Sequence, residues 1–321
     1  MQHSLGLKGL LLLIAFPLYS QKLPPSFDDS IRVVIRKQSG YEEKVDIYRA
    51  TIEKVLQVDQ ELARTYIEAL RNMASMQKDT AIIAFCYEKE ASLFYISGDY
   101  ESAGALFNKA CTAYEKAGQL SASLLACTKT GIMHNLSGQY QKAGQIYQKQ
   151  LLRSQQARQL ESEAYICNQL GALYHYQGLT DSALFYYQLS TELFSAVGDT
   201  TEMLRPMSNI AILLEPVNPD SSLVVLQKIY QLREQYGKPI DLVNTLISYG
   251  GLLRRQGLYI DAFNHYKKAY WICKKNGYQN VLPAVLDGLH DLKAATGEYD
   301  EALRYLDEAI SIIKASRSVD H

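Results

Sequence analysis

A short glycine-centred turn motif recurs along this chain of 321 residues and constrains what it can fold into. Its copies are Gly98-Asp99-Tyr100, Gly138-Gln139-Tyr140, Gly178-Leu179-Thr180, Gly257-Leu258-Tyr259 and Gly297-Glu298-Tyr299. The spacings are 40, 40, 79 and 40 residues, and a degenerate copy at Asn218-Pro219-Asp220 divides the long interval. A fixed period of this length is typical of stacked helical hairpins, each of which buries its apolar face only against its neighbours. The chain is therefore predicted to be an all-α solenoid.

Each period reads as two helices that meet at this turn. In the copy over 164–197, one face of a first helix follows the spacing i, i+3, i+4, i+7, and its residues are Cys167, Leu170, Gly171 and Tyr174. Gly178 is expected to end that helix, because glycine tolerates the left-handed backbone that closes a helix. Thr180 or Asp181 is then expected to cap the second helix. A second series of breaks lies between the hairpins, at Gly118, Gly198, Gly237 and Gly277, with Arg158 at the intervening place.

The same copies carry a small residue in the first helix and a small residue followed by a ring in the second. These sets are Ala91, Ala103 and Phe107; Gly131, Ala143 and Tyr147; Gly171, Ala183 and Tyr187; Gly250, Ala262 and Tyr266. Together with the turn motif they resemble the tetratricopeptide (TPR) repeat, in a long-hairpin variety because the period is 40 residues rather than about 34. The resemblance implies a right-handed superhelical solenoid of about seven antiparallel hairpins, as in exported bacterial TPR proteins. Its approximate repeats are 43–77, 84–117, 124–157, 164–197, 204–236, 243–276 and 283–316, within a repeat domain over 43–317.

The first 42 residues lie outside this pattern. Lys8 precedes the apolar run Leu10–Phe16, and the polar residues Gln21 and Lys22 follow Ser20, so residues 1–20 are predicted to be a secretory signal peptide. The apolar run is too short for a comfortable membrane span, although an uncleaved anchor is the alternative. Residues 21–42 are expected to form a linker or one lone helix. The protein is accordingly expected to be exported, in the periplasm or otherwise outside the cytoplasm.

The five cysteines give no disulfide framework, because their number is odd and their spacing is irregular. Cys127 and Cys167 share one position of the repeat, which indicates small apolar core residues. A bridge between Cys111 and Cys127, on neighbouring predicted helices, is the alternative.

Composition and motifs argue against several classes of function. The net charge of −1 does not fit a nucleic-acid binder, which normally carries a basic surplus. The sequence contains no phosphate-binding glycine loop, nucleophile elbow, His-Glu-x-x-His or Cys-x-x-Cys motif. We therefore predict a protein that is not an enzyme, with no cofactor, no catalytic residue and no metal site.

The TPR resemblance implies that the remaining face of each first helix lines a concave groove that binds a protein or peptide partner. The candidate partner-binding residues are Asn168, His175, Tyr176, Arg205, Ser208, Asn244, Arg254 and Arg255. Some TPR proteins clamp a peptide carboxylate with a fixed set of Lys and Asn, but here Glu88 and Thr128 occupy the matching first positions. The arginines suggest an acidic peptide or another anionic partner, because a guanidinium fits carboxylates. The alternative is that these residues are only solvated polar positions.

Two functional hypotheses follow. In the first, the chain is a free-standing exported scaffold that binds a partner in its groove. In the second, it is related to the extracytoplasmic sensory TPR regions of bacterial signalling proteins, whose kinase or DNA-binding output is missing or truncated here.

Overall fold

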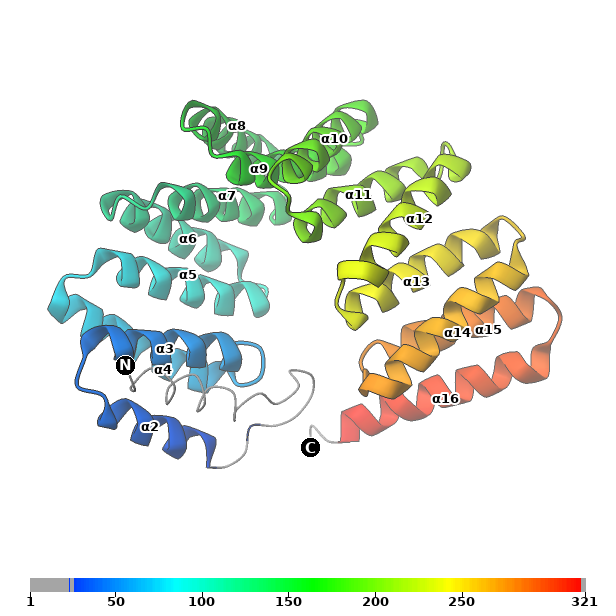
Figure 1. The fold of residues 1–321 in the computed structure, drawn as a ribbon, viewed down its shortest axis with the longest axis horizontal. Helices are drawn as coiled ribbons and strands as arrows, with labels where there is room; N and C mark the ends of the chain where they lie inside the picture. The colour runs from blue at the N-terminus through cyan, green and yellow to red at the C-terminus, as the bar shows by residue number, and fades with distance from the viewer. Residues whose placement is uncertain (1–22, 24–25, 319–321) are drawn as a thin grey trace. The chain divides into compact units, whose positions relative to one another are not determined.

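Helices joined by short turns make up the described part of the chain. The structure, a computed structural model, describes residue 23 and residues 26–318, so the predicted signal segment over 1–20 lies outside the described residues. Within them are fifteen helices and no strand. Figure 1 shows the order of the helices along the chain. In chain order they are α2 (Phe27–Lys37), α3 (Tyr41–Val55), α4 (Gln60–Gln77), α5 (Thr80–Ile96), α6 (Tyr100–Lys116), α7 (Leu120–Leu136), α8 (Tyr140–Gln156), α9 (Leu160–Tyr176), α10 (Thr180–Ala196), α11 (Thr200–Leu214), α12 (Pro219–Tyr236), α13 (Pro239–Arg255), α14 (Tyr259–Asn276), α15 (Leu282–Ala295) and α16 (Tyr299–Ser318). The predicted all-α repeat fold is confirmed.

After α2, the helices follow one another as seven consecutive pairs, from α3–α4 to α15–α16. The helices begin at or before the ranges expected from the sequence: α5 begins at Thr80 rather than 84, and α9 at Leu160 rather than 164. The lone helix α2 occupies the stretch that was expected to hold a linker or one helix. The chain divides into two compact units, one up to Met133 and the other from His134 onward.

Left-handed residues close most of the helices, as the recurring glycines predict. Gly178, which ends the first helix of its pair, has a φ of 73°, and Gly257 has a φ of 76°. Arg158 stands where a glycine stands in other repeats and still adopts a φ of 53°. Gly237 departs from this series, because it caps α12 in an extended conformation with a φ of −87°.

The N-cap position of α10 precedes both residues that the sequence analysis named for it. The residue before α10 is Leu179, and it makes no side-chain cap, so neither Thr180 nor Asp181 is the capping residue. In α6 the equivalent position is Asp99, whose carboxylate accepts a hydrogen bond of 3.0 Å from the Ser102 amide. An N-cap must precede the first helical residue, and Thr180 is already that residue.

In the hairpins α9–α10 and α13–α14, the core pairs a glycine on the first helix with a ring on the second. A Cβ atom added to Gly171 would lie 2.5 Å from Cδ1 of Tyr187, and one added to Gly250 would lie 3.1 Å from the Tyr266 ring. Tyr187 is buried at 1% exposure. The rings therefore occupy the volume that a side chain at the glycine positions would need.

Pro206 lies inside α11. The helix begins at Thr200 and runs through the buried Pro206.

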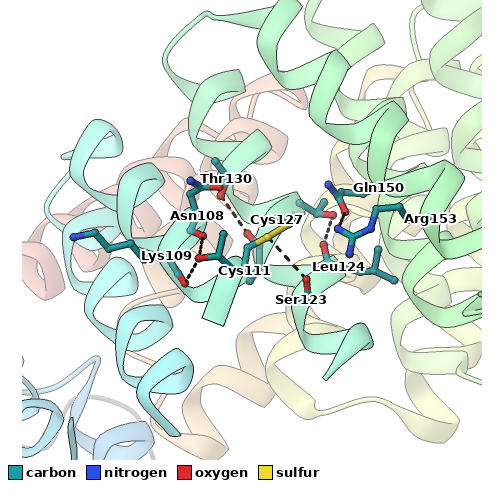
Figure 2. Close-up of a disulfide and its surroundings, with 12 residues drawn as sticks. Asn108, Lys109, Cys111, Ser123, Leu124, Cys127, Thr130, Gln150 and Arg153 are labelled. Carbon is teal, nitrogen blue, oxygen red and sulfur yellow. Dashed lines mark hydrogen bonds between the residues drawn. A yellow bond between two sulfur atoms is a disulfide. The ribbon is translucent and has the colours of Figure 1, made fainter. Parts of the chain in front are cut away.

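Cys111 and Cys127 are joined by a disulfide that links α6 to α7 (Figure 2). This corrects the reading of Cys127 as only a small core residue and bears out the alternative: both half-cystines are buried, but they are covalently paired. Neighbouring antiparallel helices bring the two side chains together, with Cα atoms 5.1 Å apart. Cys86, Cys167 and Cys273 are free and buried, and burial raises the pKa of the Cys167 thiol to about 12.

None of the helices within the described residues combines the length and the apolar character that a membrane-spanning segment needs.

Candidate functional site

The structure separates the eight predicted partner-binding residues into different settings. On α9, the Asn168 amide oxygen accepts a hydrogen bond of 3.1 Å from Asn209 of α11. His175 and Tyr176, at the end of the same helix, are exposed, and their rings lie 6.3 Å apart between centroids. None of these three residues lines the cavity between α11, α12 and α13.

Two predicted arginines are engaged with carboxylates of the protein itself. Arg205 on α11 forms an ion pair of 2.9 Å with Glu202, one turn earlier, and its side chain is 67% exposed. Arg254 on α13 forms an ion pair of 3.1 Å with Asp291 of α15. An incoming anion would have to compete with these partners.

The other three residues meet at one cavity of about 330 Å³ between α11, α12 and α13. Ser208 contributes from α11, and Asn244 and Arg255 contribute from α13. The full lining is Ser208, Ala211, Ile212, Glu215, Ser222, Leu226, Ile229, Arg233, Asn244, Thr245, Ser248 and Arg255. The volume lies at the lower end of the range of about 300–1,000 Å³ in which small ligands and ligand side chains bind.

Helix α12 forms the apolar wall of this cavity through one of its faces. Ser222, Leu226, Ile229 and Arg233 follow one another at intervals of four, three and four residues, which places them on the same side of a helix. The first three are buried, at 1%, 7% and 1% exposure. Arg233 ends the row, one turn beyond Ile229, so the wall changes there from apolar to cationic.

The sequence explains why a cavity forms in this hairpin. Leu226 stands four residues after the small residue Ser222, at the place that Tyr147, Tyr187 and Tyr266 occupy in their own helices. Leucine has less volume than tyrosine, and it does not extend a ring across the hairpin. Both turns that flank α12 also lack a left-handed glycine, because residues 215–218 contain none and Gly237 is extended.

Arg233 is the half-buried cation of the cavity. Its Nη1 donates hydrogen bonds to the Asp241 carbonyl oxygen, at 2.9 Å, and to the Thr245 hydroxyl. The Thr245 hydroxyl in turn donates to the same carbonyl oxygen at 3.1 Å. Burial lowers the pKa of the Arg233 guanidinium, the charge of Asp241 opposes that shift, and the charge of Arg205 adds to it.

Arg255 is the second cation of the lining, and it is paired. Its Nη2 forms an ion pair with Glu215, which lies in the turn after α11 and lines the same cavity. Two arginines therefore face one carboxylate in the lining, which leaves an excess of one positive charge.

Glu88 stands at a position where some TPR proteins carry a residue that clamps a peptide carboxylate. In this structure it lies in a separate polar cluster, within the unit that ends at Met133. Its carboxylate accepts hydrogen bonds from Lys129, at 2.5 Å, and from the Tyr114 hydroxyl, at 3.0 Å. Burial alone would raise the pKa of Glu88, but the charge and hydrogen bond of Lys129, together with the Tyr114 hydroxyl, hold that pKa below its usual value. Because both partners come from the protein, this cluster serves the fold.

One group of potential metal ligands occurs among the described residues. The ligand atoms of Cys111, Glu115 and Cys127 lie within 4.8 Å of one another. The two sulfur atoms are bonded to each other, so neither is available as a thiolate ligand in this structure.

Arg233 is the residue that the sequence analysis missed. The candidate residues predicted from the sequence belong to the first helix of each pair, whereas Arg233 belongs to α12, the second helix of its pair. The sequence did carry a partial signal, because Leu226 stands between the repeats of Tyr187 and Tyr266 at the position that those two residues fill with a ring.

No family model matches the sequence of this chain, and no curated protein is detectably similar to it. Solved structures do match its fold. A Rap protein complexed with competence and sporulation factor aligns with a TM-score of 0.61 at 12% identity, over 90% of this chain and 80% of that one. The Rap conjugation gene regulator of plasmid pLS20, in complex with the Phr* peptide, aligns with a TM-score of 0.58 at 12% identity, over 92% and 78%.

A third match is a signal-transduction ATPase of the STAND type with a tetratricopeptide repeat sensor, from Pyrococcus horikoshii. It aligns with a TM-score of 0.57 at 17% identity and covers 91% of this chain but 44% of that longer one. At these identities the likeness concerns the fold. The chain folds as a tetratricopeptide-like helical solenoid.

Proposed function

We propose that this chain is a non-enzymatic scaffold that binds a peptide segment of a partner at the cavity between α11, α12 and α13. The observation that carries the proposal is the cavity itself, of about 330 Å³, which lies where Leu226 stands at a position that α10 and α14 fill with the rings of Tyr187 and Tyr266. Polar groups of Ser208, Asn244 and Ser248 border an apolar wall, a combination that suits a peptide with both backbone and side-chain contacts. The Phr* peptide complex of the similarly folded Rap conjugation gene regulator supports this choice of ligand.

Restoring the missing ring should close the site. The variant Leu226→Tyr places the repeat's usual side chain in the cavity, so binding of any peptide selected on the parent chain is expected to weaken roughly tenfold or more. Peptides would first be selected from a synthetic hexapeptide library, and dissociation constants then measured by fluorescence polarisation.

Leu306→Tyr is the matched control, because Leu306 occupies the same repeat position in α16 and does not line the cavity. The control variant should bind as the parent does. Equal affinity of the parent and Leu226→Tyr would move the binding site elsewhere.

We further propose that the protein is exported. Support comes from the Lys8 and Leu10–Phe16 pattern and from the disulfide, because disulfides persist in oxidising compartments and are rare in the cytosol. The mature chain is expected to begin near Gln21, as measured by the intact mass of protein from the exported fraction. Leu12→Arg, which interrupts the apolar run, should leave the full-length precursor inside the cell. A mature protein that retains residues 1–20 in the membrane fraction would favour the anchor instead.

The alternative function is a sensory TPR region related to signalling proteins, and the fold of the Pyrococcus sensor favours it. Both hypotheses share the ligand-binding step at the cavity. They differ in whether binding changes the activity of an attached output.

A further inference from the structure

Protein groups accept hydrogen bonds from the Nη1 nitrogen of Arg233, and the Nε–Nη2 edge of its guanidinium has no hydrogen-bond partner among the described residues. Both hydrogen bonds that it donates come from Nη1, to the Asp241 carbonyl oxygen and to Thr245. No residue that the structure describes accepts a hydrogen bond from its Nε or Nη2. The Nε–Nη2 edge of an arginine is a planar fork that matches the two oxygens of a carboxylate with two parallel hydrogen bonds.

The charge of Arg233 is also uncompensated by an ion pair. Across the described residues, no carboxylate oxygen lies within 4.0 Å of its nitrogens, whereas Arg205, Arg254 and Arg255 each have such a partner. The side chain is half-buried, and burial lowers its pKa, although an arginine remains protonated at any physiological pH. A partly desolvated cation with no ion-pair partner gains more from an incoming anion than a solvated, paired cation does.

The surroundings orient such an anion. The contacts to Asp241 and Thr245 fix the plane of the guanidinium, and the apolar side chains of Leu226 and Ile229 lie along the same face of α12. The charges of Asp241 and Arg205 both act at Arg233, where the first raises and the second lowers the pKa of the guanidinium. The one acidic residue of the lining, Glu215, is engaged by Arg255.

We propose that the Nε–Nη2 edge of Arg233 receives a carboxylate of the bound peptide, either its C-terminal carboxylate or an Asp or Glu side chain. This inference rests on the proposed peptide-binding function and adds the chemical group that anchors the ligand. Arg233 thereby sets specificity for an acidic peptide from the second helix of a hairpin, and the first-helix residues Asn244 and Ser248 contact the rest of the segment.

The test uses the full chain and two position-scanning hexapeptide libraries, one with free C-terminal carboxylates and one with amidated C-termini. The tightest peptides are then resynthesised with each carboxylate replaced singly, as the C-terminal amide, Glu→Gln or Asp→Asn. Each peptide is measured against the parent, Arg233→Gln, Arg233→Lys and the control Arg304→Gln, an exposed arginine of α16. The libraries thus separate a C-terminal source of the carboxylate from a side-chain source.

We expect removal of one particular carboxylate to weaken binding to the parent chain roughly tenfold or more. Arg233→Gln should bind the peptides with and without that carboxylate equally, because the group that recognises it is gone. Arg233→Lys retains the charge without the fork and should recover part of the difference, and Arg304→Gln should behave as the parent does.

Three results are decisive. Peptides that bind with no dependence on a carboxylate, or whose carboxylate dependence survives in Arg233→Gln, overturn the anchor while the peptide-binding function stands. Failure of both libraries to bind the folded parent chain rejects the function and the anchor together. If Arg233→Gln does not fold, two other measurements still test the anchor. These are the binding of the carboxylate-replaced peptides to the parent chain and their binding to Arg233→Lys.

Discussion

Gly171→Leu is expected to lower the free energy of unfolding by about 1–3 kcal/mol, and a protein that stays folded should show a lower melting temperature. Even a methyl group at this position would lie 2.5 Å from Cδ1 of Tyr187, and that ring is buried at 1% exposure with no open space to enter. Leucine adds three further carbon atoms to the same contact. Either α9 must move away from α10 or the ring must leave its preferred rotamer, and both changes cost packing energy.

The measurement is urea denaturation followed by circular dichroism at the helical band. Ala196→Leu is the control, because it places the same leucine side chain at an exposed position near the end of α10. The control should unfold at a denaturant concentration close to that of the parent. If Gly171→Leu also unfolds with the parent, the register assigned to this hairpin is wrong.

Removing the disulfide is expected to cost a similar amount by a different mechanism. Cys111 and Cys127 are separated by 16 residues, and in the chain-entropy model a bridge that closes a loop of about this size stabilises the fold by about 3 kcal/mol. The double variant Cys111→Ser, Cys127→Ser should therefore unfold at a lower urea concentration than the oxidised parent. The gain comes from restricting the unfolded chain, so the native helical content should change little.

Two observations check this result. Reductant should destabilise the parent and leave the double variant unaffected. Thiol titration of the denatured parent without reductant should find three free thiols, because Cys86, Cys167 and Cys273 are unpaired. A count of five would mean that the bridge is absent from the protein as isolated.

The repeat architecture was predictable from the sequence because the information for it is local. Gly178 and Gly257 mark turns by a backbone requirement that few other residues satisfy, and the pairing of Gly171 with Tyr187 depends on complementary volumes within one hairpin. The cap before α10 was misplaced because the motif residue Thr180 starts the helix rather than preceding it.

The candidate site was less predictable, because it depends on which side chains meet across three helices. Arg205 and Arg254 carry the right chemistry but are paired with Glu202 and Asp291, and neither ion pair can be read from repeat positions. The disulfide was likewise only an alternative, since spacing alone does not show whether two thiols on adjacent helices face each other.

Under the proposed function, the replacement of a ring by Leu226 gives this repeat protein its binding cavity through one position of the repeat. In a globular core, an opened volume perturbs many neighbours, whereas in a linear array the disturbance is confined to the adjoining hairpins. The ring position recurs in other helices, at Tyr147, Tyr187 and Tyr266. The position of the cavity can therefore change from one hairpin to another without a change in the fold of the array. Evolution or design could move a binding specificity by exchanging one aromatic residue and one nearby charge.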